Sequence, residues 1–303
     1  MGTWGTGLYA NDFAADFKAV ISAAIRLPFD EDRLVEILCS TEPSVAENPI
    51  DEDHTIFWLV LADQFEKRGI ASARARDTAV AIIDGGIDAA TMASLGMKPA
   101  DLRKRAKVLA ELRARIVAAP AVSKPRTTMK QPEPYEMEIG GLYSFPTHKG
   151  ENINPYMTKK FFDRGAWTPD GFGLMVLVDR GRAFDYLAWY RPIVIEDAVQ
   201  TIPSLASLVT DFRWYLVDPG TCSAHHFKKM ELEKIATLEI DPEKLNRAFP
   251  GRAPGTIWAI NDISISNQMD LRRSGRIAGH PLISCRRNPS NWAVLEEIAS
   301  ISA

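Results

Sequence analysis

The chain has 303 residues, a formal net charge of -3 and 46% hydrophobic residues, an ordinary composition for a folded protein with room for two domains of about 150 residues each. The near-neutral charge excludes a global attraction to nucleic acid or acidic membranes, and no apolar run approaches the ~20 residues of a spanning helix. The start lacks the basic and apolar regions of a signal peptide, and three widely spaced cysteines, Cys39, Cys222 and Cys285, fit a reducing compartment, so we expect a cytoplasmic protein.

Residues 1–117 have the apolar spacing of a helical domain. Phe13, Phe17 and Ile21 fall on one face of a helix that Asn11 or Asp12 can cap. Further helices are expected around Leu34–Leu38 with Asp30 as cap, over 50–69, over 73–86, and from Pro99 to residue 117. In the last of these, Arg103, Lys104, Arg105, Lys107, Arg113 and Arg115 form a basic face, which we expect to be solvated.

Residues 118–137 contain four prolines and almost no large apolar side chains, which is typical of a semi-rigid linker. From residue 138 to residue 303 the segments become short, aromatic and β-branched, which predicts strands. Helices are expected within this part around Ser204–Val209, Pro242–Ala248 and Trp292–Ile301. The predicted fold class is therefore α+β: an N-terminal all-α domain, a Pro-rich linker, and a mostly antiparallel β-rich domain that could close like a barrel.

The opening GTWGTG places Trp4 between glycines, which allow the backbone to turn back on itself. We interpret Trp4, Gly5, Gly7, Asn11 and Asp12 as a structural motif that anchors the first helix. A phosphate-binding loop is excluded because no strand precedes the glycines, no lysine follows them and the GxGxxG spacing is absent. The stretch WGTGLYANDFAADF resembles the start of a bacterial family known as domain of unknown function 4259. This resemblance covers about the first 117 residues.

The second half resembles the immunity protein 26 family more weakly. The matching residues lie in IGGLYSFP and GFGLMVLVD, namely Gly140, Gly141, Tyr143, Phe145, Pro146, Gly171, Phe172 and Gly173. The chain departs from the family pattern where Gly141 replaces an acidic residue, where Leu174 replaces a basic one, and in a long insertion between the two strands. The resemblance implies a protein that neutralises the toxin of a competing bacterium by binding it, and it carries over no catalytic residue.

Residues with possible chemistry are few. Cys222, His225 and His226 could begin a zinc site, but no second ligand pair follows at a suitable spacing. Cys285 precedes two arginines that could lower its pKa, although a base such as His280 would have to be brought to it by the fold. The acidic run IDEDH is better explained as the start of a helix than as a metal site. We therefore expect no cofactor, no metal and no catalytic residue.

The long connection over residues 148–171 is the stretch most suggestive of binding. It mixes aromatic and basic residues, a composition that protein-binding hot spots favour. The candidate partner-binding residues are Tyr156, Lys159, Lys160, Phe162, Arg164 and Trp167. The alternative is that its aromatic residues pack back onto the sheet.

The sequence thus favours a non-catalytic immunity or antitoxin protein that binds a bacterial toxin and occludes it, with no membrane partner. One alternative is an enzyme of unfamiliar type in the β-rich domain. Another is a nucleic-acid-associated regulator that uses the arginine-rich stretch 272–287, although that stretch lacks aromatic residues for stacking on bases.

Overall fold

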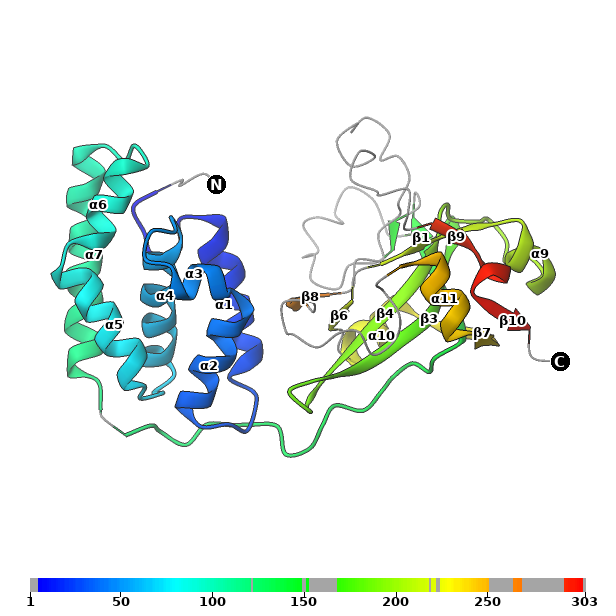
Figure 1. Ribbon diagram of the computed structural model, residues 1–303, viewed down its shortest axis with the longest axis horizontal. Coiled ribbons are helices and arrows are strands. Elements are labelled where there is room, and N and C mark those ends of the chain that lie inside the picture. The colour runs from blue at the N-terminus through cyan, green and yellow to red at the C-terminus, as the bar shows by residue number, and fades with distance from the viewer. Residues whose placement is uncertain are drawn as a thin grey trace. The chain divides into compact units, whose positions relative to one another are not determined.

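The computed structural model describes residues 5–120, 122–148, 151–152, 168–217, 219–221, 224–250, 264–268 and 292–301, the coloured parts of Figure 1. The chain divides into two compact units, one ending at Gln131 and the next starting at Pro132. The described part of the first unit is helical, whereas the second is built on a largely antiparallel, curled sheet. The predicted α+β class is confirmed. Among the described residues, no helix combines the length and apolarity needed to cross a bilayer.

The helical unit is arranged around one fully buried helix. Every residue of this helix, α4, from His54 to Phe65 is buried, so it forms the centre of the unit. Apolar residues lie on all sides of α4, as is expected of a helix that is buried in the centre of a domain. The helices are α1 (Asp12–Ala24), α2 (Glu31–Thr41), α3 (Pro43–Glu47), α4 (His54–Lys67), α5 (Ala73–Asp84), α6 (Ile87–Ser94) and α7 (Pro99–Ala118).

Short polar residues begin three of these helices by accepting hydrogen bonds from otherwise unpaired amides. The cap of α1 is Asn11, whose Oδ1 accepts the Ala14 amide at 2.8 Å, while Asp12 is the first helical residue. Asp30 caps α2 as predicted, and Ser72 caps α5. The acidic run before α4 differs from the expectation, because its carboxylates stand ahead of the helix and Asp53 makes no side-chain cap.

The β unit contains one sheet with the order β10-β7-β1-β3-β4-β5-β9. Its central strands carry apolar residues on both faces, which is why GFGLMVLVD shows an unbroken apolar run rather than alternation. The strands are β1 (Gly141–His148), β2 (Glu151–Asn152), β3 (Gly171–Ala183), β4 (Leu187–Ile195), β5 (Arg213–Leu216), β6 (Gly220–Thr221), β7 (Glu233–Ile240), β8 (Ser264–Gln268), β9 (Trp292–Val294) and β10 (Ala299–Ile301). The helical elements are α9 (Leu205–Thr210), α10 (Ala224–Met230), α11 (Pro242–Ala248) and the 3₁₀ turn η4 (Leu295–Glu297).

The helix predicted over Trp292–Ile301 is wrong. This segment forms β9, the turn η4 and β10, and its two strands pair with opposite ends of the strand order: β9 with β5, and β10 with β7. Only five residue steps separate Val294 from Ala299, so the two ends of the sheet lie within about 18 Å of each other. The sheet must therefore curl, and this segment bridges its two edges.

The curl gives the sheet an inner and an outer core. The inner core contains Val176, Ile193 and Trp214 together with residues of α9, α11 and η4, which Figure 1 shows gathered at one side of the sheet. The outer core contains Tyr143, Met175 and Tyr190 together with Phe227 and Met230 of α10. Both faces are covered, so the strands need apolar residues on each.

Gly173 is required by a close approach between β1 and β3. It lies directly opposite Phe145 in the register, and the Phe145 ring occupies the space where a Cβ of residue 173 would stand. An aromatic ring that covers a cross-strand glycine stabilises a pair that would otherwise be weak. This contact explains why the aromatic residue and the glycine occur at these two places in the sequence.

The Pro-rich stretch is held at both ends. On the helical unit, the Lys124 amide donates to Gly69 O at 2.8 Å, the Arg126 guanidinium donates to the carbonyls of Ile25, Leu27 and Phe29, and the Met129 amide donates to Arg26 O. The three carbonyls that Arg126 binds follow the end of α1, where a cation is favourable.

The other end of the stretch is fixed on the β unit. The Glu133 amide donates to Tyr186 O at 2.9 Å. The ring of Tyr135 contacts the guanidinium groups of Arg180 and Arg182, which lie 4.3 and 4.1 Å from its centre. Only about residues 130–132 lie between these two attachments.

Candidate functional site

The partner-binding residues predicted from the sequence, Tyr156, Lys159, Lys160, Phe162, Arg164 and Trp167, lie outside the described residues. So do Trp4, Cys222, Cys285 and the arginine-rich stretch 272–287. His225 and His226 fall on α10, whose backbone is described but whose histidine side chains are not. Within the described part of the chain, no group of three or more His, Cys, Asp or Glu residues is placed to hold a metal ion.

The opening segment is attached to the helical unit through polar contacts. Gly7 O accepts both the Ala10 amide and Arg105 Nη1, each at 3.2 Å. The expectation that Arg105 is solvated is wrong: its side chain is 3% exposed and forms an ion pair with Asp88. The position could have been recognised, since Arg105 continues the buried stripe of Leu109, Leu112 and Ile116.

Tyr9 anchors the same segment in a charged network on α4. Its hydroxyl donates to Asp63 Oδ2, which also accepts Lys67 Nζ at 2.7 Å, while Arg115 Nη2 reaches Asp63 Oδ1 at 2.5 Å. Burial acts to raise the pKa of Asp63, but the hydrogen bonds from Lys67, Tyr9 and Arg115 outweigh it and hold that pKa below its usual value. Burial and the hydrogen bond to Asp63 raise the pKa of Tyr9. The network therefore stabilises the neutral phenol and the ionised carboxylate.

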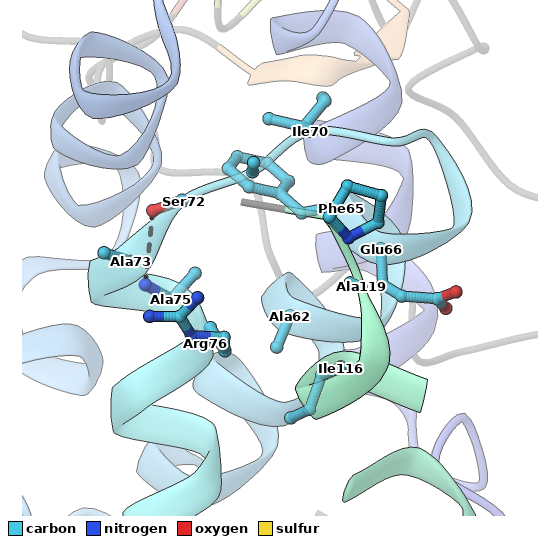
Figure 2. A pocket seen from close by; sticks show the side chains of 12 residues that line it. Ala62, Phe65, Glu66, Ile70, Ser72, Ala73, Ala75, Arg76, Ile116 and Ala119 are labelled. Atoms are coloured by element: carbon cyan, nitrogen blue, oxygen red, sulfur yellow. Dashed lines mark hydrogen bonds between the residues drawn. The ribbon is translucent and has the colours of Figure 1, made fainter. Parts of the chain in front are cut away.

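A pocket opens beside this network. It has a volume of about 190 Å³ and lies between the end of α4, the start of α5 and the end of α7. Figure 2 shows Ala62, Phe65, Ile70 and Ile116 around its opening, with Glu66 and Arg76 at its edge. Its other lining residues are Ala71, Ser72, Ala73, Ala75, Ala119 and Pro120. Small alanine side chains on three helical segments leave the space that the pocket occupies.

The walls of the pocket are fixed by the backbone at the end of α4. The Gly69 amide donates to Glu66 O and the Ile70 amide to Phe65 O, each at 2.9 Å, the pattern of a Schellman cap. This cap requires the φ of +67° that Gly69 adopts. On the opposite wall, Ser72 Oγ accepts the Ala75 amide at 3.2 Å, the dashed line in Figure 2.

A second hollow, of about 320 Å³, adjoins the pocket. The two share Glu66, Ile70, Ala119 and Pro120, and the second adds Gly69, Arg115, Ala118, Val122 and Lys124. Ala119 and Pro120 thus line both hollows, and Val122 and Lys124 continue along the second. Ser123 and Lys124 are held there by two hydrogen bonds of 2.8 Å, from the Lys124 amide to Gly69 O and from the Ala71 amide to Ser123 Oγ.

The pocket has room for one side chain, and its Ser72 and Glu66 side chains already have partners within the helical unit. A cavity of about 150 Å³ with an apolar lining accommodates a molecule of the size of benzene, so one aromatic or branched aliphatic side chain fits into the pocket. Its hydroxyl group, that of Ser72, accepts from the α5 backbone, and its carboxylate, that of Glu66, is paired with Arg115. These polar groups shape the rim of the pocket and hold it in place.

The β unit buries two opposite charges at neighbouring positions. Asp179 lies opposite Arg191 in the register of β3 and β4, and each residue is 4% exposed. The register between the strands shifts at this point, as in a bulge, which aims side chains differently from the regular ladder. Burying a charge is costly, and the two opposite charges occupy facing positions of the ladder, so we interpret the two residues as a structural feature of the sheet.

No family model, curated protein or solved structure matches the chain. The two family resemblances therefore stay predictions.

Proposed function

We propose that this protein is a non-catalytic binding protein of the immunity type, which neutralises a bacterial toxin by binding and covering it. The observation that supports this proposal is the preformed apolar pocket of the helical unit, about 190 Å³ in volume. Protein interfaces gain most of their affinity from a few large side chains that enter such pockets. The resemblance of the second half to immunity protein 26 supplies the class of partner.

The rigidity of the pocket favours this role. Its walls are set by the Schellman cap at Gly69, by the Ser72 cap and by the hydrogen bonds that hold Ser123 and Lys124. A binding surface that is already ordered loses less conformational entropy when the partner arrives. The pocket is therefore available to a partner without rearrangement of the helices that line it.

The arginine beside the pocket also supports a role in binding. Arg115 is 42% exposed and contacts both the buried Asp63 and Glu66. An arginine held in a fixed position at the edge of an apolar pocket is the kind of residue that protein interfaces favour.

The test is a pair of tryptophan variants. Ala73→Trp fills the mouth of the pocket from an exposed position at the start of α5, and Ala89→Trp adds the same side chain to an exposed position of α6 that lines neither hollow. Each variant would be co-expressed with the toxin encoded beside its gene and measured for binding and for protection of the cell. We expect Ala73→Trp to weaken binding at least tenfold and to lose protection, and Ala89→Trp to retain both.

Both variants should keep the thermal midpoint of the wild type, since both positions are exposed. If Ala73→Trp bound the toxin as tightly as the wild type, the pocket would not be the docking site. If the wild type failed to protect against every toxin encoded in its genetic neighbourhood, the immunity role itself would be refuted.

A further inference from the structure

We propose that the partner segment taken up by the two hollows carries a large apolar side chain next to a carboxylate, the apolar group entering the pocket and the carboxylate pairing with Lys124. This inference rests on the proposed function and specifies the chemistry of the partner at that same site. It follows from the charges that line the two hollows.

Four charged residues line the hollows: Glu66, Arg76, Arg115 and Lys124. Arg76 is paired with the neighbouring Asp77 at 2.9 Å. Arg115 is paired with Asp63 at 2.5 Å and with Glu66. Among the described residues, no carboxylate pairs with Lys124. The hollows therefore present one cation whose charge is not balanced within the described helical unit.

The stem that carries this cation is held in place. The aliphatic stem of Lys124 lies over Gly69, because a Cβ built on Gly69 would stand 2.8 Å from Lys124 Cδ and 3.2 Å from Lys124 Cβ. The backbone of Lys124 is held by its hydrogen bond to Gly69 O. A lysine whose stem is packed in this way loses less entropy when its ammonium group binds a carboxylate.

The geometry of the hollows sets the spacing in the partner. Ile70 and Pro120 line both the apolar pocket and the hollow that contains Lys124, so only one shared wall separates the two. A side chain in the pocket therefore brings the next residues of the partner to Lys124. Val122, 78% exposed on the wall of the second hollow, extends the apolar contact surface there.

The test uses three blocked hexapeptides titrated into the full-length, ¹⁵N-labelled protein: acetyl-GGFEGG-amide, acetyl-GGFKGG-amide and acetyl-GGSEGG-amide. We expect the Phe-Glu peptide to shift the amide resonances of Ala73, Ala119 and Lys124 at millimolar concentration. The Phe-Lys peptide should bind roughly two- to fivefold more weakly, as exposed ion pairs predict. The Ser-Glu peptide should cause no saturable shift, since its side chain cannot fill the pocket.

The charge variant Lys124→Glu should reverse the order of the first two peptides, whereas Lys130→Glu, an equal change of charge in the same segment outside both hollows, should leave it unchanged. Equal binding of the Phe-Glu and Phe-Lys peptides to the wild type would overturn the inference about charge while leaving the pocket as a docking site. The absence of shifts at these three amides with all peptides would overturn the inference as a whole. The protection assay with Ala73→Trp tests the proposed function separately from either result.

Discussion

Asp88 and Arg105 form a buried, two-pronged ion pair: Arg105 Nε lies 2.6 Å from Asp88 Oδ2, and Arg105 Nη2 lies 2.8 Å from Asp88 Oδ1. The side chains are 1% and 3% exposed. Asp88 Oδ1 also accepts the Thr55 hydroxyl, and Arg105 Nη1 reaches Gly7 O. One pair of residues thus connects α6, α7, α4 and the opening segment.

Replacing Arg105 by alanine leaves Asp88 buried without its counter-charge. The expected loss in the free energy of unfolding is about 3–5 kcal/mol, the usual cost of breaking a buried pair from one side. Urea unfolding followed by circular dichroism measures it. Arg113→Ala is the matched control on the same helix, because Arg113 pairs with Asp84 at the surface, and its midpoint should barely move. Equal losses for the two variants would show that the buried pair is no more important than the exposed one.

Asp53 should make the protein less stable as the pH rises. Burial, reinforced by Glu52 and Asp51, raises the pKa of Asp53 from 3.8 to about 6. Between these values the unfolded chain has lost the proton that the folded chain still binds, so this contribution to stability is complete below about pH 4 and is lost as the pH passes 6. Asp53→Asn, which does not titrate, should therefore be more stable than the wild type by about 1–3 kcal/mol at pH 7 and nearly equal to it at pH 4. Urea unfolding at four pH values tests this; a difference that stays constant from pH 4 to pH 7 would contradict it.

Gly173→Ala should destabilise the β unit. The added methyl group collides with the ring of Phe145, which is itself only 3% exposed and has little room to move. Overpacking of this kind costs about 1–3 kcal/mol. Gly7→Ala is the control, since no atom lies within 4 Å of a Cβ built at that position. Thermal unfolding of both variants measures the effect, and an unchanged midpoint for Gly173→Ala would mean that β1 and β3 approach less closely than described.

Much of the fold could be predicted because its signals are local. The apolar spacing of Phe13, Phe17 and Ile21 and the cap at Asp30 belong to single helices, and each gave the right element. The prediction of a helix over Trp292–Ile301 was wrong because the apolar residues of this segment also match helical spacing. The strands with which it pairs, β5 and β7, are distant in sequence. Periodicity within one segment cannot show which distant strand that segment completes.

The pocket was missed for a related reason. Its lining is dominated by alanines such as Ala62, Ala75 and Ala119, which carry no chemical signature, and it exists only because three helical segments meet there. Lys124 was assigned to a linker on the basis of proline content. What distinguishes it is its contact with Gly69, 55 positions earlier in the sequence, which composition cannot reveal.

Arg126→Ala should release the part of the Pro-rich stretch that lies on the helical unit. The Arg126 guanidinium binds three carbonyls beyond the end of α1, and no other single side chain described in that stretch donates to as many. In the wild type we expect proteinase K, a protease of broad specificity, to cleave the stretch within residues 130–132; in the variant, new cleavage sites should appear over residues 123–129. Mass spectrometry of the fragments identifies the sites. Lys130→Ala, an exposed position of the same stretch, should leave the pattern unchanged, and identical fragments from Arg126→Ala would show that the attachment does not depend on this residue.

The bridge between the two edges of the sheet has a consequence for biosynthesis. Strands β1 to β7 are made before residues 292–301, so a growing chain carries a sheet with two unpaired edges until β9 and β10 have left the ribosome. Open edges of this kind are prone to pair with other chains. Helices α1 to α7 and residues 122–129, which are attached to them, are all made before the first strand, so they do not wait for the end of the chain. A chain that ends before residue 292 would therefore contain a folded helical unit and an incomplete sheet that is prone to aggregate.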